Sequence, residues 1–291
     1  MTIAELISKV FLPLSLAIIM LGMGMTLITA DFTRILKYPK AILLGLTNQL
    51  IFLPLIGFML AIGFDLNPVM AVGLMILATC PGGPTSNLIT LICKGNIALS
   101  VTLTAFSSMI SILTIPFILY FAIDYFGTGT NVLIKLPLGD TIVQIMGITV
   151  IPISIGMLIR TYKPNFAKQM EKPMRIASAL LFFVVFIAVI AANFTIIGRG
   201  MREVGFVTLL LNLLTMSVGY LTAKLCKLKL KNAISITIES GIQNGTLAFV
   251  IATSILNNIE MGIPIGAYAI WMFITGGILM WFWGKRKDIT T

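Results

Sequence analysis

Glu239 is a carboxylate set deep inside a long apolar segment, next to a dense group of oxygen-bearing side chains. It belongs to the run Ile238-Glu239-Ser240-Gly241-Ile242-Gln243-Asn244-Gly245, which residues typical of a membrane helix flank on both sides. An ionised acid inside a bilayer costs a few kcal/mol unless a cationic or strongly polar group pairs with it. The apolar runs contain no Lys or Arg at comparable depth. The sequence therefore predicts that Glu239 binds a cation taken from solution.

A second apolar segment is interrupted by residues that cannot continue a helix. In the run Cys80-Pro81-Gly82-Gly83-Pro84, two prolines and two glycines occupy four successive positions, and both residue types disfavour helix interiors. Backbone groups released by such a break in lipid must be buried in protein or face a wet cavity. Thr85, Ser86 and Asn87 follow the break directly, so their side-chain oxygens are predicted to begin a new half-helix.

The segment around Glu239 is predicted to break in the same way, near Gly241 and Gly245. A single break of this kind can be an ordinary kink. Here two polar breaks occur, offset by five helices, and the odd offset means that the two segments cross the membrane in opposite directions. Opposed half-helices that meet near the midplane are typical of secondary transporters with inverted repeats. Their N-termini attract an anionic substrate group, and their unwound carbonyls hold cations.

Two further groups of polar side chains lie in apolar segments. Gln49 follows Asn48 in the middle of one run. In another, four hydroxyl side chains at spacings i, i+4, i+7 and i+11 share one helical face: Ser100, Thr104, Ser107 and Ser111. Packing between helices is the alternative interpretation for both groups, because hydroxyl and amide side chains are common at transmembrane interfaces.

The composition is that of an integral membrane protein. Of the 291 residues, 58% are hydrophobic and 10% are charged, and the mean hydropathy is +1.05, whereas a soluble domain carries about 25% charged residues. The net charge of +10 does not indicate nucleic-acid binding, because the basic residues lie between apolar runs, where they set membrane orientation. The chain has no histidine, which excludes His-based metal sites and Ser-His or Cys-His catalysis. We therefore expect a protein that is not an enzyme.

Nine apolar runs are long enough to span a bilayer. Sixteen of the 20 Lys and Arg residues follow the odd-numbered runs, and four lie on the opposite side. Because positive charge accumulates on the cytoplasmic side, the N-terminus is predicted outside and the C-terminus in the cytoplasm, in a multi-pass protein of the inner (plasma) membrane. The predicted spans are 10–29, 40–62, 69–93, 97–124, 139–159, 175–197, 204–225, 232–256 and 263–283.

Several long motifs, in order over nearly the whole chain, make the sequence similar to the bile acid:sodium symporter family. They are Cys80-Pro81-Gly82-Gly83 with Ser86-Asn87, then Gly95-Asn96-Ile97-Ala98-Leu99-Ser100-Val101, then Ile238 to Asn244, with weaker support from Gly22-Met23-Gly24-Met25-Thr26-Leu27. The resemblance implies an all-α polytopic fold with inverted repeats and two broken helices that cross. It also implies one transporter unit over residues 1–291, with a panel of about 10–29 and 139–197 and a core of about 40–124 and 204–283.

The resemblance further implies two sodium ions behind the crossing point of the broken helices. Hard oxygen ligands of the kind that alkali cations prefer are expected at both sites. The first ion is expected on Ser86, Asn87, Ser100, Thr104 and Glu239. The second is expected on Gln49, Glu239 and Gln243, with the backbone carbonyls of Ser240 and Ile242. The substrate is expected beside Pro84, Thr85, Asn244 and Gly245, where Pro84 and Thr85 replace the family's common Thr and Ala.

Taken together, the residues and the resemblance predict a secondary transporter that imports an organic anion by alternating access, with two sodium ions per substrate. The family's substrates include bile acids, sulfated steroids and small carboxylates, and the short chain favours a small carboxylate. The expected partners are this anion and the lipid bilayer, without nucleic acid, and the fold can act as a monomer. The alternatives are proton coupling through Glu239, an intramembrane enzyme and a non-transporting membrane receptor. An enzyme would need a second deep carboxylate, and a receptor would need no opposed broken helices.

Overall fold

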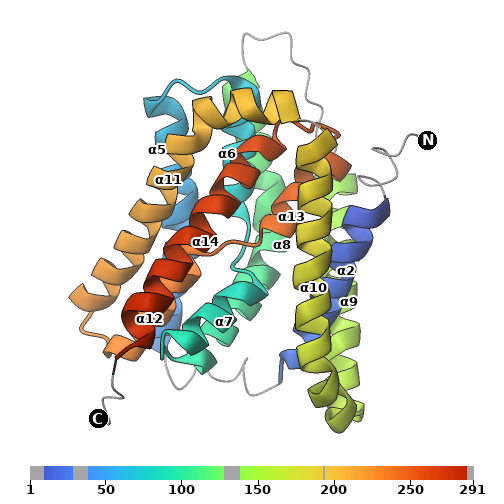
Figure 1. Cartoon of the computed structure of the whole chain (residues 1–291), viewed down its shortest axis with the longest axis vertical. Coiled ribbons are helices and arrows are strands. Elements are labelled where there is room, and N and C mark those ends of the chain that lie inside the picture. Colours follow the sequence, from blue (N-terminus) through green and yellow to red (C-terminus); the bar gives the residue numbers. More distant parts are fainter. Residues whose placement is uncertain (1–9, 29–38, 128–137, 193, 287–291) are drawn as a thin grey trace.

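The computed structural model describes residues 10–28, 39–127, 138–192 and 194–286, and within these ranges helices are joined by short connections (Figure 1). Two π-helical turns, η3 (Asn48–Phe52) and η4 (Ile251–Ile255), continue neighbouring α-helices. The α-helices are α2 (Leu12–Thr26), α4 (Pro39–Thr47), α5 (Leu53–Gly63), α6 (Pro68–Thr79), α7 (Pro84–Ile92), α8 (Ile97–Gly127), α9 (Leu138–Tyr162), α10 (Pro164–Ala192), α11 (Phe194–Leu225), α12 (Leu230–Gly241), α13 (Gly245–Val250) and α14 (Gly262–Gly284).

Several of these helices have the length and apolarity that a bilayer requires. Within the described residues, five stretches qualify: Pro39–Gly63, Ile97–Gly127, Ile142–Tyr162, Gly200–Leu225 and Gly262–Gly284. Shorter apolar helices cover Pro13–Thr26, Pro68–Thr79 and Gly245–Ile255. The chain is therefore an all-α, polytopic membrane protein. The count of nine spans stays a prediction.

The predicted loop between residues 160 and 174 is wrong. Helix α9 continues to Tyr162 and α10 begins at Pro164, so Lys163 alone separates them. A proline at the first helical position costs nothing, since its missing N–H would be unpaired there anyway. Long basic side chains reach water from a helix end without ending the helix. The connection predicted at 198–203 is also helical, because it lies within α11. The loop charges counted at Lys9, Arg34, Lys37, Lys135 and Lys287, and the polar residue Asn193, lie outside the described residues.

The helices form two groups. Helices α2, α9 and α10 pack on one another, while α11 packs on α12 and α14, and α6 packs on α5, α8 and α14. Figure 1 shows the first group side by side along one edge of the molecule. The groups meet where α8 contacts α9 and where α13 contacts α2.

Both predicted interruptions are present, and they lie against each other. Helix α6 ends at Thr79 and α7 begins at Pro84, while α12 ends at Gly241 and α13 begins at Gly245. An isolated antiparallel bridge pairs Gly82 with Gln243.

Helices α2 and α9 approach so closely at two glycines that their backbones face each other directly. A methyl group added to Gly24 of α2 would lie 2.2 Å from the carbonyl oxygen of Ile153, and one added to Gly156 of α9 would lie 2.3 Å from that of Leu21. Glycine at both positions lets the helices approach closely, as small residues do in membrane interfaces.

We expect Gly156→Ala to destabilise the protein by about 1–3 kcal/mol, because the new methyl group meets backbone that cannot rotate away. Gly147→Ala is the matched control on the same helix, since nothing lies within 4 Å of its added methyl group. Melting temperatures in detergent compare the two variants with the wild type. Equal melting temperatures for both would contradict the close α2–α9 crossing.

Candidate ion and substrate sites

Each break supplies a hydrogen-bond partner for a backbone group of the other break. Each break removes carbonyl groups from their usual helical partners, and in a membrane interior these groups need new ones. The Asn244 N–H donates to the Pro81 carbonyl at 2.9 Å. On the α7 side, Pro84 occupies the first turn, where a missing N–H is tolerated. The Ser86 N–H donates to the Gly83 carbonyl at 3.0 Å.

The Glu239 carboxylate, which is 2% exposed, is held by three hydroxyl groups. Ser86 of α7 donates to Oε2 at 2.7 Å, and Ser100 of α8 donates to the same oxygen at 3.1 Å. Thr104 of α8 donates to Oε1 at 2.5 Å. The three hydroxyls are neutral hydrogen-bond donors. Because neutral donors leave an ionised carboxylate with its negative charge, the arrangement is suited to a bound cation.

Asn87 belongs to the same cluster, one hydrogen bond further from the acid. Its Oδ1 lies 2.8 Å from the Ser100 hydroxyl and shares the single Ser100 proton with Glu239 Oε2. The residue also lines the large cavity described below. The structure thus brings together all five residues predicted for the first ion. The cluster consists of Ser86, Asn87, Ser100, Thr104 and Glu239.

A second cluster joins the side chains of Gln49 and Gln243. Gln49 Nε2 donates to the Cys80 carbonyl at 2.9 Å and to Gln243 Oε1 at 2.5 Å. Gln243 Nε2 donates to the Ser240 carbonyl at 2.9 Å. Each amide nitrogen therefore meets a backbone carbonyl, which fixes the orientation of both amides. Ile242 follows α12 in an extended conformation, within the break itself. The hydrogen bonds of Glu239 described above do not reach Gln49 or Gln243.

The fixed orientation of Gln49 leaves one oxygen unpaired. Gln49 Oε1 is buried and has no hydrogen-bond partner among the described residues. A buried acceptor without a partner costs about 1–3 kcal/mol. A cation placed beside this oxygen would remove the penalty, and the amide and carbonyl oxygens of this cluster are hard ligands of the kind that such cations bind.

The sequence did not predict how Gln49 reaches the crossing. Gln49 lies in the π-helical turn η3, and its neighbour Asn48 donates to the Thr222 hydroxyl of α11 at 3.0 Å. Single π turns inside α-helices often occur at functional sites. The adjacent amides Asn48 and Gln49 were the only trace of this turn in an otherwise apolar run.

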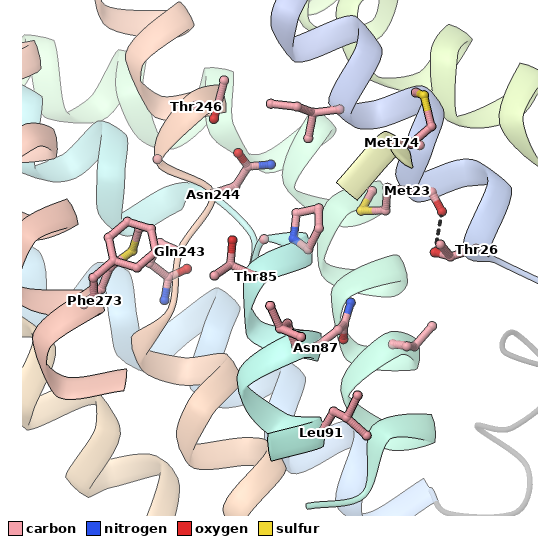
Figure 2. Close-up of a pocket in the computed structure, with 18 of the residues that line it drawn as sticks. Met23, Thr26, Thr85, Asn87, Leu91, Met174, Gln243, Asn244, Thr246 and Phe273 are labelled. Atoms are coloured by element: carbon pink, nitrogen blue, oxygen red, sulfur yellow. Dashed lines mark hydrogen bonds between the residues drawn. The ribbon is translucent and has the colours of Figure 1, made fainter. Parts of the chain in front are cut away.

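A cavity of about 550 Å³ opens next to the two breaks, between α2 and α10 on one side and α7, α13 and α14 on the other (Figure 2). All four residues predicted to face the substrate line it: Pro84, Thr85, Asn244 and Gly245. The described lining contains no Lys or Arg. Sequence reasoning missed the apolar lining from α2, α10 and α14, which has the character of ordinary membrane helices: Ile19, Gly22, Met23, Met174, Met272 and Phe273.

One polar group in the cavity wall lacks a partner. Asn244 Oδ1 accepts a hydrogen bond from the Leu247 N–H at 3.0 Å and caps α13. Its Nδ2 is buried without a hydrogen-bond partner in the described part of the chain. Figure 2 shows the Asn244 amide above Thr85, among the residues that surround the cavity. This N–H₂ group is thus a buried donor without a partner, in a residue that lines the cavity.

Gly82 touches the acid directly. A methyl group added at Gly82 would lie 2.2 Å from Glu239 Oε1, whereas one added at Gly83 would have its nearest neighbour, the Asn244 Cα, at 3.4 Å.

We therefore expect Gly82→Ala to displace the Glu239 carboxylate and weaken sodium binding by about tenfold or more, as loss of ligand orientation does at other metal sites. Gly83→Ala, one residue further, should keep sodium binding close to that of the wild type. Melting temperature as a function of sodium chloride concentration measures both variants. If both variants show the same dependence of melting temperature on sodium, Gly82 does not determine the position of the ion ligand Glu239, and the prediction is wrong.

Three similar proteins align with most of the chain. An uncharacterized sodium-dependent transporter of Bacillus subtilis is 29% identical over 281 residues, which cover 95% of this chain and 84% of the relative. A probable chloroplastic sodium/metabolite cotransporter of rice (Oryza sativa subsp. japonica) is 26% identical over 271 residues, 93% of this chain and 63% of the relative. The human ileal sodium/bile acid cotransporter is 28% identical over 255 residues, 84% of this chain and 69% of the relative.

These relatives are transporters, in agreement with the expectation that the chain is not an enzyme. The model of the sodium bile acid symporter family matches residues 13–199, more than half of the chain. That match includes α6, the first break, α7 and α8, which carry most of the first cluster. The protein therefore belongs to the sodium bile acid symporter family, whose members couple transport to sodium.

Proposed function

We propose that this protein imports an organic anion together with two sodium ions by alternating access. One observation carries the proposal. A buried carboxylate, Glu239, lies at the crossing of two broken helices, and the groups that contact it are neutral oxygen donors. A site of this kind attracts a cation from solution, and a cavity lies on its other side.

The two clusters divide between the two ions. The first ion binds the hydroxyl and amide oxygens around Glu239, supplied by Ser86, Asn87, Ser100 and Thr104. The second ion binds Gln49 Oε1, which is buried and unpaired, together with Gln243 and the carbonyls of Ser240 and Ile242. Glu239 contributes to both sites. Two sodium ions and one carboxylate together leave one net positive charge, which attracts an anion.

The cavity holds the substrate. It is mostly apolar with a few polar groups, as binding sites for small molecules are. With no Lys or Arg in the described lining, the anionic group of the substrate accepts hydrogen bonds from Asn244 Nδ2 and from the N-terminal turn of α7, where the helix dipole is positive. The apolar body lies against α2 and α10. The substrate is thus an organic monoanion, either bile-acid-like or a small carboxylate.

Movement of the two helix groups relative to each other exposes the cavity first to one side of the membrane and then to the other. The panel consists of α2, α9 and α10, and the core consists of the remaining helices, in a chain of nine spans with inverted repeats. The N-terminus lies outside and the C-terminus in the cytoplasm. The cavity extends from the breaks to Leu91 and Ile97, which flank the basic turn at Lys94. In this orientation that end is cytoplasmic, so the described conformation faces the side of release.

The proposed stoichiometry supplies enough energy for accumulation. A tenfold sodium gradient provides about 1.4 kcal/mol for each ion. The net positive charge that enters with two ions and one monoanion adds about 2.3 kcal/mol per 100 mV of membrane potential. Together these terms give about 5 kcal/mol, which supports accumulation of a few thousand-fold.

We expect uptake into proteoliposomes to require sodium and to respond to voltage. With potassium inside and valinomycin added, an inside-negative potential should accelerate uptake of a monoanionic substrate, and the reversed potential should slow it. Glu239→Ala should abolish sodium-dependent uptake. Uptake that depends on sodium but ignores the potential would exclude the two-ion stoichiometry. Uptake driven by a proton gradient without sodium would favour proton coupling through Glu239.

The two ion sites should also be separable. Thr104→Val and Gln49→Ala each remove one side-chain oxygen from one cluster, so each should lower the Hill coefficient of sodium activation from near two toward one. Thr237→Val is the matched control, because the acceptor of this buried hydroxyl, within the described part of the chain, is the Ala233 carbonyl of its own helix. A Hill coefficient near two in both site variants, at wild-type sodium affinity, would contradict the assignment.

A further inference from the structure

The carbonyl of Gly241, at the end of α12, receives two hydrogen bonds from other helices. Asn212 of α11 donates through Nδ2 at 2.8 Å, and Tyr268 of α14 donates through its hydroxyl at 2.9 Å. A carbonyl oxygen has two lone pairs, so both are occupied. Gly241 therefore has no acceptor capacity left for an ion.

A third residue fixes the donors. The Thr275 hydroxyl of α14 donates to Asn212 Oδ1 at 2.8 Å, which orients the amide so that its nitrogen faces Gly241. Tyr268 and Asn212 are fully buried, with 0% exposure. Helix α11 packs against both α12 and α14, and Figure 1 shows these helices on the same side of the molecule. The three residues form a clamp, defined here as Asn212, Tyr268 and Thr275.

The clamp determines which way the next carbonyl points. Ile242 has φ −111° and ψ 99°, an extended conformation in which the carbonyls of two successive residues point to opposite sides. Because the clamp holds the Gly241 carbonyl toward α11 and α14, the Ile242 carbonyl is turned to the other side. That side faces the first break, since the Asn244 N–H, two residues on, donates to the Pro81 carbonyl.

We propose that Asn212, Tyr268 and Thr275 are positioning residues for the second sodium ion. The inference rests on the function proposed above. The clamp residues do not contact the ion. They occupy the Gly241 carbonyl with hydrogen bonds, so that it does not bind the ion, and they orient the Ile242 carbonyl toward the ion. Without the clamp, the Gly241 carbonyl would be a buried acceptor without partners, and the break could relieve that cost by rotating its peptide groups.

Sodium titrations of melting temperature on the purified full-length protein test the proposal, with choline chloride holding the ionic strength constant. Tyr268→Phe removes only the hydroxyl, and Thr275→Val removes the group that orients Asn212. Each should raise the sodium concentration for half-maximal stabilisation about tenfold, as loss of outer ligand partners does at other metal sites. A merely structural role would lower the melting temperature in choline and leave this midpoint unchanged.

Thr208→Val is the matched control. The Thr208 hydroxyl is buried and shares its proton between the Val204 and Gly205 carbonyls of its own helix. The Thr275 hydroxyl has the corresponding carbonyls of Trp271 and Met272 within reach, and its shortest contact is with Asn212 Oδ1. The sodium midpoint of Thr208→Val should match the wild type. If Tyr268→Phe does not fold, the sodium midpoints of Thr275→Val and Thr208→Val still test whether the clamp positions the ion.

Each outcome is decisive. A wild-type sodium response with unchanged midpoints in Tyr268→Phe and Thr275→Val would overturn the positioning role and leave the proposed function intact. An equal rise in Thr208→Val would also overturn it, because the effect would then follow any lost helix hydroxyl. A wild-type protein that does not respond to sodium would overturn the proposed function and this inference together.

Discussion

The rest of the structure depends on one requirement, that backbone groups released by two helix breaks find partners inside the membrane. In lipid an unpaired N–H or C=O costs several kcal/mol. Here the partners come from the other break and from neighbouring helices. The Pro81 carbonyl pairs with the Asn244 N–H, and the Cys80 carbonyl with Gln49. Since each break depends on groups outside its own helix, the crossing forms only when the surrounding helices are in place.

Electrostatics follows from this arrangement. The groups that complete the breaks are amides, hydroxyls and backbone dipoles, none of which carries a full charge. When Glu239 is ionised, its negative charge therefore has neutral donors around it and no fixed cation among its hydrogen-bond partners, at a place buried from water. Neutral donors hold the carboxylate in position, and its charge remains available to mobile ions. The cavity beside it is similarly without fixed cations in its described lining, so an anion that enters responds to helix dipoles and to whatever cations the clusters bind.

Much of this could be predicted from the sequence, for reasons that are local. A continuous helix cannot run through Pro81-Gly82-Gly83-Pro84, and Glu239 in an apolar run needs a partner wherever it lies. The hydroxyl face of α8 was predicted by helical periodicity. Other features depend on three-dimensional context. The adjacent amides Asn48 and Gln49 do not by themselves indicate a π turn. Asn212, Tyr268 and Thr275 are isolated polar residues whose association becomes visible only when α11 and α14 pack together. The helical stretch at 160–174 was mistaken for a loop because charge was equated with irregular backbone.

The π turn also has an evolutionary meaning. A π turn holds one residue more than the α-helix that surrounds it, so it corresponds to a single inserted codon. Deleting one residue from 48–52 would restore a regular helix and rotate the residues on one side of the deletion by about 100° relative to the other. Gln49 and the anchor of Asn48 on Thr222 would then no longer face their partners together. One ligand of the second cluster is thus one insertion away from an ordinary apolar helix, whereas the Pro-Gly break requires several substitutions. Homologues that differ in length by one residue at this turn would reveal lineages in which this ligand was gained or lost separately from the rest of the site.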